Sequence, residues 1–119
     1  MHEMSVARSI LAVALDYLPA GANLRRVCVT VGPLHGIERG AMDWAWRALL
    51  CAEGRPHVDL DLKIAAWRVR CRSCGQKYIS RRLDGVCACG SRKVTLVGGN
   101  ELRVDDIEIE PEPALEPSP

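Results

Sequence analysis

Four cysteines in two close pairs restrict the fold of this chain more than any other feature. Cys71-x-x-Cys74 is followed, after twelve intervening residues, by Cys87-x-Cys89. Two such pairs on either side of a short loop can supply four thiolates to one tetrahedral Zn(II) ion, with no coordination position left for a substrate. The pattern predicts a structural zinc site, although four free thiols or two disulfides would also satisfy the spacing.

The second cysteine pair is irregular because it has one intervening residue where zinc-binding turns usually have two. A shorter bite can still chelate, but its local turn must differ, so Cys87 is the ligand with the least regular expected geometry. Gly75 and Gly90 follow the two pairs and allow tight turns that direct backbone amides toward the sulfurs. Zinc binding to such a module contributes roughly 10 kcal/mol or more to folding, depending on pH.

Size and charge limit the class of protein. The chain has 119 residues and a net charge of +1, which fits one domain with a small appended module and gives no general attraction to nucleic acid or membranes. We find no apolar run long enough to span a bilayer and no pattern of a secretory signal at the start. We therefore expect a cytoplasmic protein with reduced cysteines, which favours metal binding over disulfides.

The spacing of apolar residues predicts two helices and three strands outside the cysteine region. We expect helices over residues 4–18 and 38–53, and strands around residues 27–31, 58–66 and 102–109. The alternation changes phase at Asp105-Asp106, which predicts a β-bulge or a bend in the last strand. The expected fold class is α+β: a small three-stranded sheet with two helices on one face, plus an inserted zinc-ribbon-like module.

We expect three parts along the chain. Residues 1–67 and 94–110 form the α+β domain, residues 68–93 form the zinc-binding module, and residues 111–119 form a disordered, acidic, proline-rich tail. The module is basic, with Arg68, Arg70, Arg72, Lys77, Arg81 and Arg82. A basic zinc ribbon can bind nucleic acid or dock an acidic protein. Tyr78 is the only aromatic residue that accompanies these arginines, which favours the protein partner.

The remaining cysteines and tryptophans are expected to pack in the core. Cys28 lies in a predicted strand and Cys51 lies late in a predicted helix, so both are interpreted as small apolar residues. Packing roles are also expected for Trp44, Trp46 and Trp67, although one exposed indole could mark a protein interface. We expect His35 and His57 at the surface, without a partner at ligand spacing.

The chain begins with Met1, His2 and Glu3, which brings several nickel-type donors together. The Met1 amine, the His2 backbone nitrogen and the His2 ring can close two fused chelate rings around one ion. Planar, nitrogen-rich sites favour Ni(II) or Cu(II). Alternatively, His2 is an exposed side chain at a frayed terminus, and Glu3 is an acid favoured by the helix dipole. Imidazole binds metal when neutral, so affinity should fall below its pKa of about 6.5.

Four motifs occur in one order along the chain. They are Met1–Ser5, the strand and loop Val29–Leu34, the two cysteine pairs, and Gly99–Arg103. Together they resemble the HypA/HybF family, the nickel-incorporation accessory proteins of [NiFe]-hydrogenase maturation, and the likeness extends over residues 1 to 110. The family usually has Cys-x-x-Cys in the second pair, so this chain departs from the family pattern there.

The resemblance implies a nickel metallochaperone and not an enzyme. Ni(II) is then a transient cargo held at His2 with Met1 and Glu3, Asp43 is a weaker candidate that completes or gates the site, and Zn(II) is structural. The resemblance also implies transfer with a HypB-type GTPase to the [NiFe]-hydrogenase large subunit, and some members serve urease maturation. The alternatives are a basic zinc ribbon that binds nucleic acid and a zinc-stabilised adaptor without a nickel function.

Overall fold

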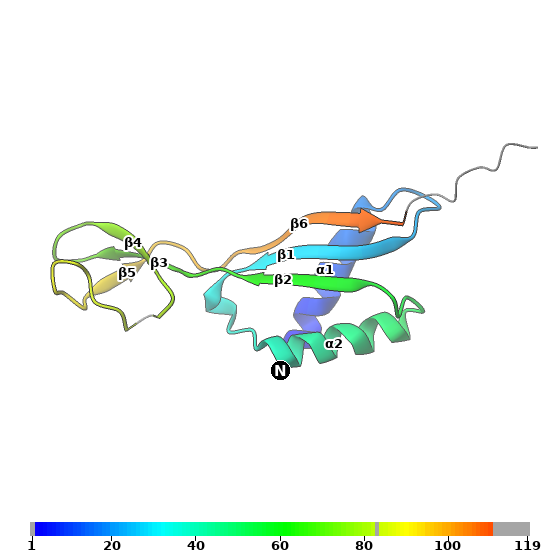
Figure 1. The fold of residues 1–119 in the computed structure, drawn as a ribbon, viewed down its shortest axis with the longest axis horizontal. Coiled ribbons are helices and arrows are strands. Elements are labelled where there is room, and N and C mark those ends of the chain that lie inside the picture. Colours follow the sequence, from blue (N-terminus) through cyan, green and yellow to red (C-terminus); the bar gives the residue numbers. More distant parts are fainter. Residues whose placement is uncertain (1, 83, 111–119) are drawn as a thin grey trace, which may run out of the picture.

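The computed structural model describes residues 2–82 and 84–110, so Met1 and the expected disordered tail lie outside the described residues. The elements are α1 (Glu3–Tyr17), β1 (Leu24–Val31), the 3-10 turn η1 (Pro33–His35), α2 (Arg39–Ala52), β2 (Asp59–Ile64), β3 (Trp67–Cys71), β4 (Lys77–Ser80), β5 (Val94–Leu96) and β6 (Leu102–Ile109). They form two separate three-stranded sheets, and both helices lie against the larger one (Figure 1). Within the described part of the chain, no helix is both long and apolar enough to cross a membrane.

The larger sheet has the strand order β2-β1-β6. β1 pairs in parallel with β2 and antiparallel with β6, and α2 is part of the crossover between the two parallel strands. Cys28 lies opposite Asp106, whereas the next residue, Val29, lies opposite Val104. Asp105 is therefore the extra residue of a β-bulge, which confirms the predicted change of phase.

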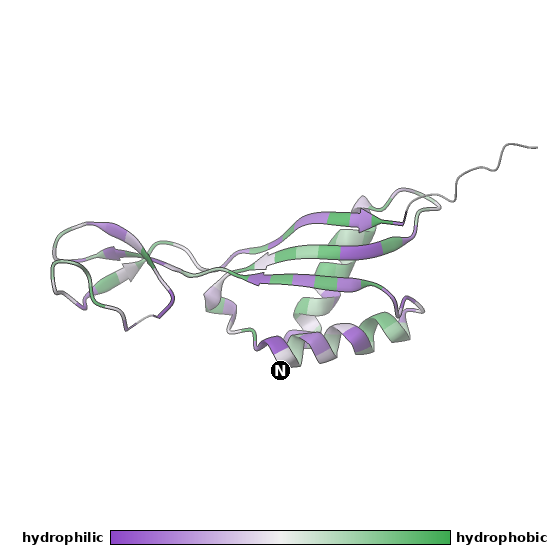
Figure 2. Ribbon diagram, in the orientation of Figure 1, coloured by the Kyte–Doolittle hydropathy of each residue, from purple (hydrophilic) through white to green (hydrophobic). Residues whose placement is uncertain are grey.

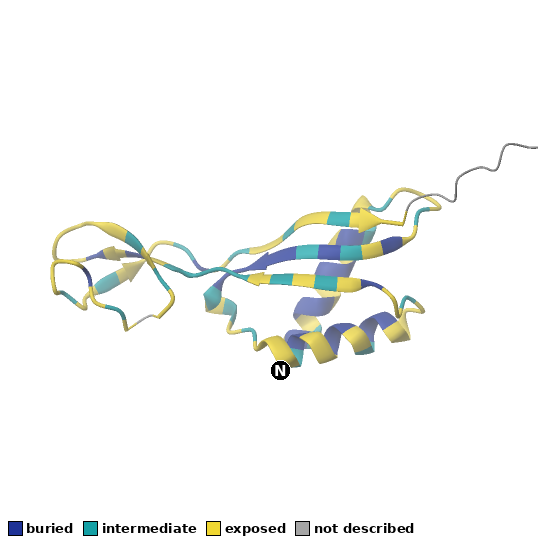
Figure 3. Cartoon of the chain, viewed as in Figure 1, coloured by how far each residue is buried: buried dark blue, intermediate teal, exposed yellow. Residues whose placement is uncertain are grey.

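The core lies between this sheet and the two helices. Val27, Val29 and Val31 alternate along β1 and are buried against helix residues. Trp46 of α2 is also buried, and its indole Nε1–H donates to the carbonyl oxygen of Val58 at 2.9 Å. Apolar and buried stripes coincide on the helix surfaces that face the sheet (Figure 2, Figure 3). The predicted α+β class, with two helices on one face, is confirmed.

The three strands of the smaller sheet were not predicted from the sequence. β3 lies in its centre and pairs antiparallel with both β4 and β5. These strands have three to five residues each, and arginines occupy alternate positions of β3. Short strands with charged outer faces carry a weak hydrophobic signal, although Val69 and Cys71 do show the period of two.

The two sheets are joined by residues 65–66 and 97–101. The backbone N–H of Gly32 donates to the carbonyl oxygen of Glu101 at 2.7 Å, and the Glu101 carboxylate forms an ion pair with Arg68 of β3. A Cβ atom at Gly32 would clash with the backbone oxygen of Gly99, so only glycine permits this close approach. Backbone and side-chain bonds therefore tie the junction together.

The packing predictions for Cys51 and Trp44 were wrong, and Trp44 is the exposed indole that was considered as the alternative. Cys51 is exposed, and the Trp44 side chain is 71% exposed. The buried residues of α2 are Met42, Ala45, Trp46, Leu49 and Leu50. Positions 44 and 51 fall outside this stripe because of the helical repeat of 3.6 residues. Cys28 and Trp67 are half-buried.

Candidate metal centres

Four sulfur atoms converge at one end of the smaller sheet. The Sγ atoms of the four cysteines that the sequence analysis selected all lie within 4.8 Å of one another. Cys71 Sγ is 3.6 Å from Cys89 Sγ, and Cys74 Sγ is 3.6 Å from Cys87 Sγ. Four sulfurs bound at about 2.3 Å around a tetrahedral zinc ion would be roughly 3.8 Å apart. The donor set and its spacing therefore fit one Zn(II) ion.

Tight turns bring each cysteine pair together. In the first pair, the Cys74 amide donates to Cys71 Sγ at 3.5 Å, and Gly75 adopts a φ of 78°. In the second pair, Gly90 adopts a φ of 91° and donates its amide to the Cys87 carbonyl oxygen at 2.8 Å. Glycine takes this left-handed conformation without steric cost. The shorter second pair therefore closes its turn through Gly90 and still presents both sulfurs.

Backbone amides and mutual repulsion act in opposite directions on the thiols. The amides of Cys74 and Ser73 are the main cause that lowers the pKa of Cys71 to about 6. The amide of Cys89 lowers the pKa of Cys87, but burial and hydrogen bonds from the neighbouring sulfurs outweigh it and raise the value to about 11. Four adjacent thiols do not ionise together without a compensating cation. A bound divalent cation would supply that charge.

The first described residue, His2, is the N-cap of α1 and is exposed. Its ring atom Nε2 lies 2.5 Å from the carbonyl oxygen of His35 in η1. A carbonyl oxygen only accepts hydrogen bonds, so Nε2 carries the hydrogen, and the tautomer of this ring that can bind a metal has its lone pair on Nδ1. The His35 ring donates in turn from Nε2 to the Asn100 carbonyl oxygen at 3.0 Å.

The contacts of His35 were not predicted from the sequence, which placed this residue at the surface without a partner at ligand spacing. The residue is half-buried, and its backbone and ring contact two distant segments of the chain. His2 and His35 are separated by 33 positions. No local motif could reveal the contact, because it involves a main-chain oxygen that every residue type has.

The two carboxylates considered for the nickel site lie in different environments. Glu3 is 4% exposed, and its Oε1 has no hydrogen-bond partner among the described residues. Burying an unpaired carboxylate oxygen is costly, so Glu3 is a candidate for an interaction with a cation. Asp43 is largely exposed and pairs with Arg47 at 3.2 Å. Within the described residues, no hydrogen bond or ion pair joins Asp43 to His2 or Glu3.

A family model with the description "Hydrogenase/urease nickel incorporation, metallochaperone, hypA" matches residues 1–109. The chain belongs to the HypA family. Hydrogenase maturation factor HypA of Rhodobacter capsulatus is 35% identical over 115 residues, which cover 92% of this chain and 99% of that protein. The HypA of Trichormus variabilis is 31% identical over 112 residues, with 92% and 96% covered.

Solved structures agree with the family assignment. The solution structure of the Ni metallochaperone HypA from Helicobacter pylori has a TM-score of 0.60 and 26% identity, and it covers 92% of this chain and 97% of that one. The predicted resemblance to HypA is confirmed. This HypA-family chain is a nickel-incorporation metallochaperone of hydrogenase maturation, a class of maturation factor and not an enzyme.

Proposed function

We propose that this HypA-family chain holds Ni(II) at its amino terminus and delivers it, together with a HypB-type GTPase, to the large subunit of a [NiFe]-hydrogenase. The donors are the Met1 amine, the His2 backbone nitrogen and His2 Nδ1, and Glu3 supports the site. The hydrogen bond from His2 Nε2 to the His35 carbonyl oxygen carries this proposal. Histidine ligands commonly donate their second ring nitrogen to a carbonyl, which fixes the tautomer and the ring orientation.

The position of His2 at the start of α1 also suits metal binding. The first amides of a helix have no carbonyl partner within the helix. The His2 backbone nitrogen can therefore lose its proton and bind a metal without breaking a helical hydrogen bond. A partner can also replace ligands at a chain end one donor at a time. This suits a carrier that must release its cargo.

We propose that one structural Zn(II) is held by Cys71, Cys74, Cys87 and Cys89. The zinc ion would neutralise the crowded thiolates and fix the two turns relative to β3. We also propose that residues 1–67 and 94–110 form the nickel domain and that residues 68–93 form the zinc domain, with the strands of the smaller sheet reaching across both limits. A reducing compartment such as the cytoplasm would preserve the thiolates. Asp43 stays a weaker proposed contributor to the nickel site.

Nickel titration of untagged, zinc-loaded protein tests the proposal. Wild type should bind one Ni(II) besides zinc, whereas His2→Ala should lose the nickel and keep the zinc. His57→Ala is the matched control, because His57 is also exposed and lies far along the chain, 3.5 Å from Glu110. Nickel binding that persists in His2→Ala, or after acetylation of the Met1 amine, would refute the proposed site.

Hydrogenase activity tests the delivery step separately. In cells that lack this chain, the wild-type gene should restore hydrogenase activity, and His2→Ala should restore it only when nickel is added in excess. Full restoration by His2→Ala at low nickel would favour the zinc-stabilised adaptor over the nickel carrier.

A further inference from the structure

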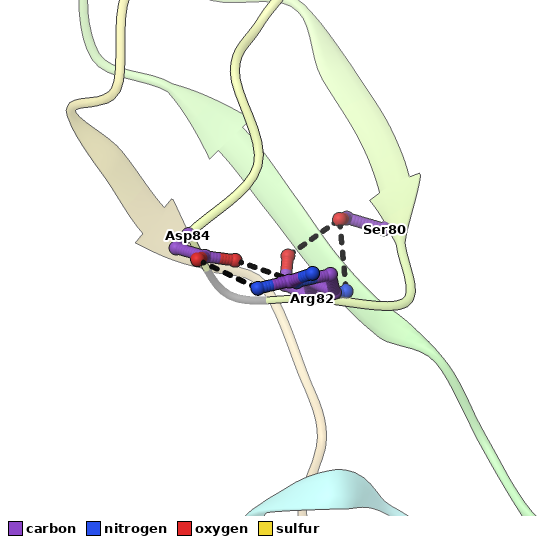
Figure 4. A network of polar contacts seen from close by, with 3 residues as sticks. All are labelled: Ser80, Arg82 and Asp84. Atoms are coloured by element: carbon purple, nitrogen blue, oxygen red, sulfur yellow. Dashed lines mark hydrogen bonds and ion pairs between the residues drawn. The ribbon is translucent and has the colours of Figure 1, made fainter.

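Charge is divided unevenly between the two sheets. Residues 67–96 contain eight of the sixteen lysines and arginines of the chain but only one of its fifteen acidic residues, Asp84. Asp84 is already paired, because Arg82 Nε and Nη2 lie 3.1 and 3.2 Å from its carboxylate oxygens (Figure 4). Ser80 binds the backbone of Arg82 in the same turn. The other cations of this segment therefore have no acid within the segment to neutralise them.

Several of these cations lie on one open face of the smaller sheet. Val69 and Cys71 are buried on one face of β3, which we term the zinc side. Their neighbours Arg68 and Arg70 therefore point to the opposite side. The strand register places Ile79 opposite Arg68 and Lys77 directly opposite Arg70. Like charges directly across a strand pair destabilise a sheet. The exposed fraction of Ile79 is 72%, so an apolar side chain stands beside this repulsive pair.

A cavity of about 360 Å³ continues this face at the junction of the two sheets. Ile79 and Arg81 line it from the smaller sheet and its loop, and Thr30 and Lys63 line it from the larger sheet. Lys63 and Arg81 form no ion pair within the residues that the structure describes. Glu101, Arg68 and Arg103 also line the cavity, but each is already in an ion pair. The cavity therefore combines an apolar wall with two cations that are available to a ligand.

We propose that this surface, termed the basic face and defined as Lys63, Arg70, Lys77, Ile79 and Arg81, binds a short acidic segment of a partner protein. Carboxylates of the segment lie between the cations and remove the repulsion between Arg70 and Lys77. An apolar side chain of the segment covers Ile79 at the mouth of the cavity. This docking surface is separate from the nickel site at His2, so it does not depend on the proposed function.

The surroundings of the basic face favour a protein over a nucleic acid. Trp67 and Tyr78 are the aromatic residues of the smaller sheet, and by strand alternation both lie on its zinc side. Between β3 and β4 the basic face therefore carries no aromatic side chain on which bases could stack, and Trp67 lies beside Arg81 only, in a separate cavity. On the larger sheet, Cys28 pairs with Asp61 on one side and Asp106 on the other, so the surface turns acidic. A long polyanion would be repelled there, whereas a short acidic segment would not reach it.

Fluorescence anisotropy with a defined probe tests the proposal. The probe is an end-blocked, fluorescein-labelled peptide of about ten residues, with glutamates around two central leucines, and it is titrated with zinc-loaded full-length protein. Lys77→Glu is the sharpest variant, because it replaces the repulsion with Arg70 by a cross-strand ion pair and so preserves the fold. It should raise Kd about fivefold or more. Ile79→Ser should raise Kd by a similar factor.

Arg25→Glu is the matched control, since it makes the same change of charge at an exposed position near the start of β1, the end that lies away from the smaller sheet. Its Kd should stay within about twofold of wild type. Equal weakening by Arg25→Glu and Lys77→Glu would overturn the proposal, as would an unchanged Kd in Ile79→Ser. Tighter binding of a single-stranded oligonucleotide with the same charge as the peptide would also overturn it.

Nickel binding by the same samples separates this proposal from the proposed function. Lys77→Glu should bind nickel as wild type does, and His2→Ala should bind the peptide as wild type does. If His2→Ala keeps nickel but Lys77→Glu still loses the peptide, the nickel site fails and the basic face stands. If His2→Ala loses nickel but Lys77→Glu binds the peptide as wild type does, the basic face alone is overturned.

Discussion

The ion pair between Arg68 and Glu101 crosses the junction between the two sheets, and a double-mutant cycle should measure its contribution to stability. The side chain of Glu101 is 18% exposed and that of Arg68 is 55% exposed. Fully exposed pairs contribute about 0.2–1 kcal/mol, and removal of one partner of a buried pair costs about 3–5 kcal/mol. Because the arginine is half exposed to solvent, we expect a coupling free energy of about 1–2 kcal/mol, between these limits.

The cycle compares wild type, Glu101→Gln, Arg68→Met and the double variant by urea unfolding at neutral pH, with zinc bound. The Glu101 carboxylate also accepts the Gly99 amide at 3.3 Å, and its backbone oxygen accepts the Gly32 amide. The glutamine retains the shape of the side chain, so these backbone contacts persist and the cycle isolates the charge interaction. A coupling free energy below about 1 kcal/mol would refute the reasoning, because the pair would then act as an ordinary exposed one.

Three further predictions concern individual side chains. Burial and the nearby Asp106 and Asp61 raise the pKa of Cys28 to about 11, so iodoacetamide at about pH 8 should alkylate it roughly tenfold more slowly than a thiol of pKa 9.0; equal rates in peptide mapping would contradict this. Glu38 caps α2 by accepting the Gly40 and Ala41 amides at 2.8 and 2.6 Å, which lowers its pKa below 4.5. Its capping contribution to stability should be complete above pH 4.5 and lost as the pH falls through the lowered folded-state pKa. An NMR titration that gives Glu38 a pKa that is not lowered from 4.5 would contradict this. Cys74→Ser should lose zinc and become sensitive to protease between residues 67 and 96, whereas a full zinc content would mean that Cys74 is not a ligand.

Local patterns in the sequence predicted much of the larger sheet and its two helices. The alternation of Val27, Val29 and Val31 predicted the central strand, and the phase change at Asp105 predicted the bulge found opposite Cys28. These predictions succeed because burial on one face of a strand imposes a period of two on adjacent residues. The smaller sheet escaped the same approach, because its β3 strand alternates arginines with only two buried residues, Val69 and Cys71.

The sequence by itself was enough to identify the family and the four candidate zinc ligands, because chelation requires particular side chains at short spacing. Only the tertiary structure decided what surrounds them. The carbonyl oxygen of His35 meets the His2 ring because the η1 turn folds back toward the start of α1, and Arg70 faces Lys77 because β3 and β4 pair in one register. Contacts of this kind depend on backbone positions that are distant in the chain, and a backbone atom or a strand register leaves no signature in residue identity.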